Sequence, residues 1–215
     1  MSKPCRTALV LGATGGIGGE TALALSRHGW NIRALSRSAK PSAHSTGWDW
    51  VKGDALDRAS IIVAAQGADA IVHAVNPPGY RNWAALVLPM IENTIAAAKP
   101  SGARILLPGT IYNYGQDAFP VLREDSPQNA TTHKGKIRIA LEHKLEDAVR
   151  DGVRSLIVRF GDFFGPKPGN NWFSQAMVKP HRPLTSITSP GRKGVGHDWG
   201  LPAGRRRNIR SVDGP

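Results

Sequence analysis

Residues 8–18 read Ala-Leu-Val-Leu-Gly-Ala-Thr-Gly-Gly-Ile-Gly, an apolar run that ends in glycines at positions 12, 15 and 18. An amphipathic stretch, 20–28, follows directly. Strand, glycine turn and helix in this order open a βαβ unit that binds a dinucleotide, because glycines let the backbone turn sharply and approach a diphosphate closely. The N–H groups and the positive end of the helix would hold the phosphates. The residues assigned to this role are Gly12, Thr14, Gly15, Gly16, Ile17 and Gly18. From the motif alone, a glycine-rich turn without a ligand stays open.

Length and composition limit the class of protein. The 215 residues suffice for one α/β domain and a small second lobe. The single cysteine, Cys5, excludes a disulfide framework and fits a reducing cytoplasm. The polar segment 1–6 leads straight into the first expected strand, and no apolar run is long enough to span a membrane. We therefore expect a cytoplasmic protein with no signal peptide and no membrane partner.

The net charge of +12 is concentrated near the end of the chain. Eight Lys or Arg against two Asp place +6 in residues 179–215. A basic balance of this kind can indicate a nucleic-acid partner. Because the excess lies in a stretch with little apolar pattern, we rank a nucleic-acid binder acting through Arg205–Arg207 third among the functions.

Strand and helix patterns alternate regularly along the chain. The expected strands are 7–11, 31–35, 50–52, 70–75, 104–107 and 155–160. The expected helices are 16–27, 59–66, 83–99, which Pro89 should break or bend, and one from Thr131 or Thr132 to 150. Alternation of this kind predicts a doubly wound α/β fold: a parallel sheet in the order 3-2-1-4-5-6, with the ligand at the carboxyl ends of the strands.

The glycine spacing, G-x-x-G-x-x-G in the form Gly-Ala-Thr-Gly-x-Ile-Gly, resembles the short-chain dehydrogenase/reductase superfamily. More narrowly, it resembles the extended and atypical branch, the NAD-dependent epimerase/dehydratase group. Four further segments carry the resemblance, which covers about residues 5–175. They are Gly53-Asp-Ala-Leu-Asp57, Leu107-Pro-Gly-Thr-Ile-Tyr-Asn-Tyr-Gly115, Arg159-Phe-Gly-Asp-Phe-Phe-Gly-Pro166 and the helix that Lys136 opens.

The resemblance implies roles for particular residues. Asp54 would lie against the adenine ring, and Ala55 and Ala74 would also line the cofactor site. Thr110 takes the position of the catalytic Ser/Thr after the fifth strand. Lys136 corresponds to the Lys of the Tyr-x-x-x-Lys motif, which binds the cofactor ribose.

The chain departs from this motif at the position four residues before Lys136, where Thr132 stands in place of Tyr. An aliphatic hydroxyl is far too weak an acid to replace a phenol near neutral pH. An imidazole can donate or accept a proton near neutral pH, but the neighbouring His133 is one step along the helix, which turns its side chain by roughly 100°. We interpret Tyr112 and Tyr114 as packing residues.

The cofactor is predicted from the end of the second strand. A NAD-selective site carries an acid there, about 20 residues past the glycines. This chain reads Leu-Ser-Arg-Ser at 35–38, with no acid before Asp49. Because a guanidinium pairs with a 2′-phosphate that a carboxylate would repel, Arg37 favours NADP over NAD.

The expected organisation is a Rossmann domain (1–166), a partial, rudimentary substrate lobe (167–199) and a basic disordered tail (200–215). We interpret the chain as truncated, for which a change of reading frame near residue 200 is one explanation. The leading function is hydride transfer between NAD(P) and a carbonyl or nucleotide-sugar-like small molecule. A catalytically silent NADP-binding sensor or regulatory module is the alternative, favoured by the missing Tyr. The substrate and any homo-oligomer are left open.

Overall fold

The computed structural model describes residues 5–38, 47–77 and 82–163, with short further stretches at 177, 182–183, 185–187 and 199–200. The chain forms two compact units, Met1–Arg159 and Phe160–Pro215. Six strands and four α-helices are described up to residue 160. They are β1 (Thr7–Leu11), α1 (Gly16–Arg27), β2 (Asn31–Ser36), β3 (Asp49–Lys52), α2 (Arg58–Ala64), β4 (Ala70–His73), α3 (Trp83–Ser101), β5 (Arg104–Thr110), α4 (His133–Val149) and β6 (Ser155–Phe160).

The strands form a six-stranded sheet in the order β3-β2-β1-β4-β5-β6. The pairings of β1 with β2 and β4 are parallel, and Leu11 lies opposite both Leu35 and His73. The predicted doubly wound α/β fold and strand order are therefore confirmed. The order reverses between β1 and β4, and the carboxyl ends of the strands at such a reversal are where ligands bind in this class of fold.

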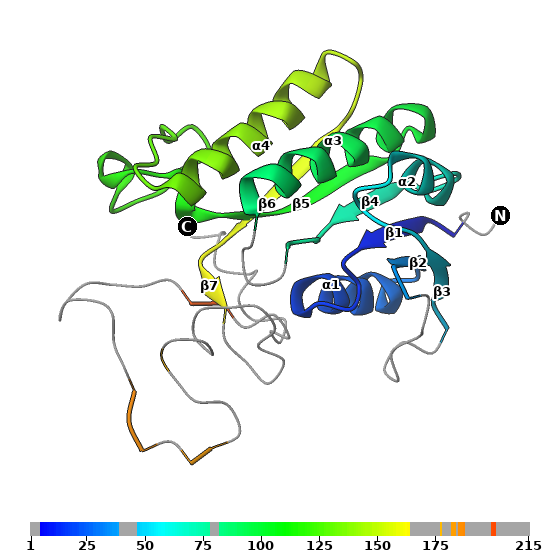
Figure 1. Cartoon of the computed structure of the whole chain (residues 1–215), viewed down its shortest axis with the longest axis horizontal. Helices are drawn as coiled ribbons and strands as arrows, with labels where there is room; N and C mark the ends of the chain where they lie inside the picture. Colours follow the sequence, from blue (N-terminus) through cyan, green and yellow to red (C-terminus); the bar gives the residue numbers. More distant parts are fainter. Residues whose placement is uncertain are drawn as a thin grey trace, which may run out of the picture. The chain divides into compact units, whose positions relative to one another are not determined.

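Helices cover both faces of the sheet, with α1 on one side and α2, α3 and α4 on the other (Figure 1). The larger core lies on the side of α2, α3 and α4, and helix α4 illustrates how it forms. Its buried residues Ile137, Leu141, Leu145 and Ala148 recur every three or four positions, which puts them on one face. A smaller cluster that includes Ala8, Val10 and Ile32 lies on the other face.

Helix α3 differs from its prediction, because it runs without a break through Pro89. Pro89 lacks the N–H that would bond to the carbonyl of Ala85, and this costs one helical hydrogen bond. The buried side chains of Val87 and Ile91 lie on either side of it. Burial of this face against the core keeps the helix continuous, so of the predicted break or bend the break is wrong and the bend stays a prediction.

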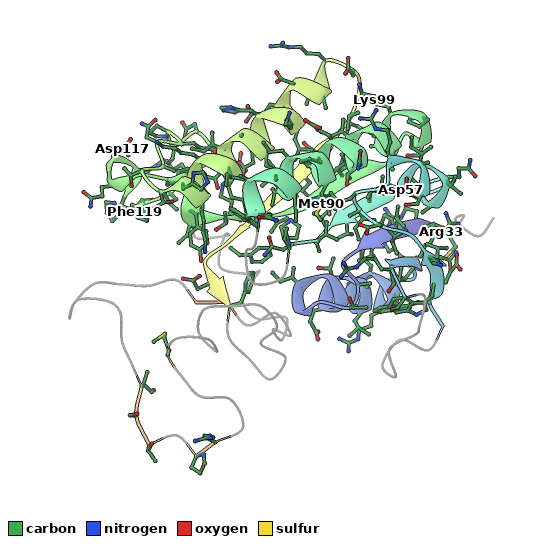
Figure 2. All side chains as sticks on the ribbon, in the orientation of Figure 1. Arg33, Asp57, Met90, Lys99, Asp117 and Phe119 are labelled. Carbon is green, nitrogen blue, oxygen red and sulfur yellow. The ribbon has the colours of Figure 1, made fainter. Side chains whose placement is uncertain are left out.

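The side chains also fix the edge of the sheet (Figure 2). Arg33 on β2 pairs with Asp49 at 3.1 Å between Nε and Oδ2. Its Nη1 donates to the carbonyl oxygens of Ala64 and Gln66, at 2.7 and 2.8 Å. Arg33 therefore ties the end of α2 to strands β2 and β3.

Within the second unit, β7 (Asp162–Phe163) pairs in parallel with β8 (Trp199–Gly200). The rings of Phe160 and Phe163 lie 5.3 Å apart. Most of the expected partial lobe and nearly all of the expected basic tail, including Arg205–Arg207, lie outside the described residues. The boundaries at 166 and 199 stay predictions.

No helix in the described part of the chain is both long and apolar enough to cross a membrane. Over the same ranges, no group of three His, Cys, Asp or Glu side chains is arranged to hold a metal ion.

Candidate cofactor-binding site

The turn after β1 is closely packed against the end of β4. Gly12 has a φ of +86°, a conformation that favours glycine. A Cβ at Gly12 would overlap the carbonyl of Ala74, and a Cβ at Gly18 would overlap the carbonyl oxygen of Gly12. Side chains at these two positions would force β1, α1 and β4 apart. The two glycines are therefore needed for this approach of backbone to backbone.

Helix α1 begins without a capping side chain. Gly15 is its N-cap, with an extended backbone and no side-chain hydrogen bond, and the first turn carries no acidic residue. The Gly15 N–H donates to the carbonyl of Gly12 at 2.9 Å. Thr14 and Gly15 are exposed, whereas Gly16 and Ile17 are half-buried. The positive end of the helix is thus reachable at the reversal point of the sheet, which fits a phosphate group.

The end of β4 completes this part of the site. The Ala74 N–H donates to the carbonyl of Leu11 at 3.0 Å. A Cβ at Gly18 would lie 3.2 Å from the Ala74 Cβ. Ala74, predicted to line the cofactor site, therefore lies beside the glycine turn.

The residues predicted to hold the adenosine half follow the neighbouring strands β2 and β3. Arg37 is exposed immediately after β2. Asp54 follows β3, and its Oδ1 accepts the N–H of Leu56 at 3.0 Å, which closes a turn. Ala55 is buried, and its carbonyl accepts from the side-chain amide of Asn93 at 3.1 Å. Their roles toward a cofactor stay predictions.

Thr110 ends β5 and is held at two atoms. Its hydroxyl accepts the N–H of Tyr112 at 3.3 Å. Its carbonyl accepts from Nη1 of Arg159 at 3.1 Å. The backbone at Thr110 is therefore fixed by a side chain from β6.

Arg159, which holds the Thr110 carbonyl, belongs to a buried polar network. Arg159 makes a two-pronged ion pair with Glu142, at 2.8 Å from Nη1 to Oε1 and 2.6 Å from Nη2 to Oε2. Glu142 is only 1% exposed. Its Oε2 also accepts from Gln128 at 3.1 Å, and Oε1 of Gln128 accepts from Asn113 at 2.8 Å. The hydrogen bond to Glu142 raises the pKa of Arg159 above its ordinary value. Sequence patterns did not single out this network. The available signal was Glu142, an acidic residue directly after Leu141 on the apolar face of α4.

The start of α4 packs against the turn that follows Thr110. A Cβ at Gly135 would overlap the carbonyl oxygen of Tyr112. The Thr132 hydroxyl accepts the N–H of Gly135 at 3.0 Å and so caps the helix. Thr132, Lys136 and the neighbouring His133 are all exposed. The structure thus brings the beginning of α4 to the carboxyl end of β5, while the catalytic assignment of Thr110 and Lys136 stays a prediction.

A second cluster lies at the carboxyl end of β4. The indole N–H of Trp83, the first residue of α3, donates to Oδ1 of Asn76 at 2.5 Å. The guanidinium carbon of Arg138, on α4, lies 5.2 Å from the centre of the Trp83 ring. His73 is buried, with Nδ1 2.8 Å from the Thr94 hydroxyl. Burial first, and the charge of Arg138 second, lower the His73 pKa to about 3. The sequence analysis did not single out this cluster.

Comparison with solved structures supports the same fold. UDP-glucose 4-epimerase from Brucella ovis, solved in complex with NAD, matches with a TM-score of 0.67 at 21% identity, covering 75% of this chain and 53% of that one. UDP-glucose 4-epimerase from Thermotoga maritima, solved with UDP-glucose, also gives 0.67, at 14% identity, covering 80% and 62%. The chain therefore spans roughly half to two thirds of the length of these neighbours.

A curated relative and a family model match the sequence itself. A 3-diazoavenalumate denitrifying reductase from a Streptomyces species is 30% identical over 178 residues, covering 75% of this chain and 57% of the relative. The model of the NAD dependent epimerase/dehydratase family matches residues 8–181, a range that contains the glycine turn, helix α4 and all of the six strands except Thr7, the first residue of β1. The chain belongs to the NAD dependent epimerase/dehydratase family.

Proposed function

We propose that the chain binds NADP(H) in preference to NAD(H) and transfers hydride between the nicotinamide and a small-molecule substrate. The close approach of the glycine turn to the end of β4, beside the uncapped start of α1, carries this proposal. The family membership and the NAD complex of the Brucella ovis neighbour support it. The single exposed thiol, Cys5, fits work in the reducing cytoplasm.

The residues present offer suitable groups for the diphosphate and the adenosine half of such a cofactor. The start of α1 at Gly15 would hold the diphosphate. Arg37, exposed after β2, would pair with a 2′-phosphate, and Asp54 would lie at the adenine. When bound, the nicotinamide supplies or accepts the hydride. Thr110, held by Arg159, would offer its hydroxyl to the substrate.

The test separates binding from turnover. Titration with NADPH and with NADH, followed by fluorescence, should give a lower Kd for NADPH. NADPH oxidation is then measured across carbonyl and nucleotide-sugar substrates. A protein that binds neither dinucleotide contradicts the proposal. Binding without hydride transfer to any acceptor would leave the silent NADP-binding module as the function.

A second candidate substrate class follows from Thr132. Its hydroxyl caps α4 and is too weak an acid to protonate a developing alkoxide. We therefore also propose an acceptor that takes hydride without a proton, as an aryl diazonium does: a C–H bond forms and the C–N bond breaks. The electron pair of that bond leaves with N₂, and no proton is required. The name of the Streptomyces relative, a denitrifying reductase of a diazo compound, supports this class.

NADPH deuterated at one face of C4 tests this class with an aryl diazonium salt. If the enzyme transfers the hydride, deuterium should reach the ring carbon from NADPH labelled on one face of C4 and not from NADPH labelled on the other. The rate of this transfer should exceed the rate without protein. Equal transfer from both faces, at the rate of the blank, would rule this acceptor class out.

A further inference from the structure

We propose that Lys52, at the end of β3, is a second cation for the 2′-phosphate and so helps to select NADP(H) over NAD(H); this rests on the proposed cofactor. Lys52 is the last residue of β3, and Ser36 is the last residue of β2. The two lie opposite each other in the parallel ladder. The Gly53 N–H also donates to the Ser36 carbonyl at 3.1 Å, so the pairing extends to the ends of both strands. Lys52 is therefore a direct neighbour of the strand end that Arg37 follows.

The side chains of Ser36 and Lys52 lie on the face of the sheet that α1 covers. Successive residues of a strand point to opposite faces, so residues two apart share a face. Ala34, two residues before Ser36, belongs to the smaller core on the α1 side. Trp50, two residues before Lys52, packs against the same core. Because α1 begins at the carboxyl end of β1, Lys52 and the start of α1 share one face and one end of the sheet.

The spacing of the strands suits a phosphate held between two cations. Neighbouring strands lie about 4.8 Å apart. Arg37 directly follows β2, and both Arg37 and Lys52 are exposed. A phosphate above the end of β2 is therefore within reach of a long, flexible side chain from each strand. The 2′-phosphate would lie there, because the adenosine half is assigned to the ends of β2 and β3.

Hydroxyl groups surround the same strand end. The Ser36 and Ser38 hydroxyl oxygens lie 3.3 Å apart, and the Ser38 N–H donates to the Ser36 hydroxyl at 3.4 Å. Hydroxyls donate to phosphate oxygens, and Lys and Arg do so with the added attraction of their charge. The end of β2 thus offers neutral donors between the two charged ones.

The nearby carboxylates do not neutralise these cations. Asp49 pairs with Arg33 at 3.1 Å. Asp54, two residues past Lys52, accepts a backbone N–H within its own turn. Among the described residues, neither Arg37 nor Lys52 forms an ion pair. Two neighbouring cations without a carboxylate repel each other, and a bound phosphate removes this repulsion. NADH carries no phosphate at this position, so the second cation favours NADPH alone.

The experiment compares Lys52→Met and Lys52→Glu with Lys99→Met as the matched control. Lys99 is exposed near the end of α3, which leads to the amino end of β5, and pairs with Asp151 (Figure 2). Dissociation constants are measured for NADPH, NADH, adenosine 2′,5′-bisphosphate and adenosine 5′-monophosphate. Lys52→Met should weaken NADPH and the bisphosphate about 5- to 10-fold, the effect of one charged contact partly screened by water. It should leave NADH and the monophosphate within twofold. Lys52→Glu should weaken NADPH further, and Lys99→Met should change no constant by more than twofold.

Three results would overturn the inference. Unchanged NADPH binding by Lys52→Met and Lys52→Glu would make Lys52 a solvated surface cation. Equal losses for NADPH and NADH would assign its charge to a part that the two cofactors share. An equal loss with Lys99→Met would show only the effect of net charge. A different failure belongs to the proposed function: wild type that binds NADH as tightly as NADPH, or binds neither, contradicts the cofactor itself.

Discussion

Replacing Glu142 with Gln should destabilise the fold strongly while keeping the shape of the side chain. The carboxylate is 1% exposed, and the Arg159 side chain is 25% exposed. The amide keeps one acceptor for Arg159 but removes the charge and leaves a guanidinium donor without its partner. Breaking a fully buried pair costs roughly 3–5 kcal/mol. Because Arg159 retains some contact with water, we expect about 2–3 kcal/mol here.

This loss is large against a total stability of about 5–15 kcal/mol. Urea unfolding, followed by circular dichroism, measures it as a lower midpoint with an unchanged slope. In a thermal scan the same loss corresponds to roughly 4–12 °C. Glu146→Gln is the matched control, since Glu146 lies on the same helix and is exposed; it should change stability by no more than about 0.5 kcal/mol. A loss below about 1 kcal/mol for Glu142→Gln, or an equal loss for both variants, would refute the reasoning.

Two further predictions concern the cofactor and the buried histidine. Arg37→Ala should weaken NADPH by about 1–3 kcal/mol in titrations and leave NADH nearly unchanged, because only NADPH carries the 2′-phosphate; equal losses for both would contradict the assignment of Arg37. The pKa of His73 is lowered from 6.5 to about 3 in the folded protein, so its contribution to stability is complete above about pH 6.5 and is lost as the pH falls toward 3. The control is His73→Asn, which keeps a partner for Thr94 but does not titrate. Between pH 7 and pH 4, the free energy of unfolding of wild type should fall by up to about 1.4 kcal/mol per pH unit more than that of His73→Asn. An equal fall for the two proteins would show that His73 does not contribute.

The fold was predictable because its signals are local. The glycines that allow the turn after β1, and the alternation of apolar runs with helical patterns, need only neighbouring residues to be recognised. The error at Pro89 has the opposite origin, since the burial of Val87 and Ile91 outweighs a local preference. The pattern predicted Thr131 or Thr132 as the cap of α4, and the structure shows that it is Thr132, whose hydroxyl accepts the N–H of Gly135.

The buried polar network around Glu142 could not be predicted from local patterns. Glu142, Gln128 and Arg159 meet only after the chain has folded, over separations of 14 and 17 residues. The motif spacing also could not show that Lys136 is exposed, whereas Arg138 on the same helix is partly buried over Trp83. Identifying which face of α4 is buried requires the positions of α3 and β4.

Gly15→Asp shows whether the start of α1 binds the diphosphate of a nicotinamide dinucleotide. Gly15 has the extended backbone of an N-cap, a position where Asp stabilises helices, whereas a Cβ there would lie only 3.3 Å from the Gly12 carbonyl oxygen. Because these two effects oppose each other, the variant should keep a melting temperature close to that of wild type. Its carboxylate would repel the phosphates at close range. Wild type should bind NADPH, and folded Gly15→Asp should bind it at least tenfold more weakly. Equal binding by the two proteins, or no binding of either dinucleotide by wild type, would contradict this role of α1.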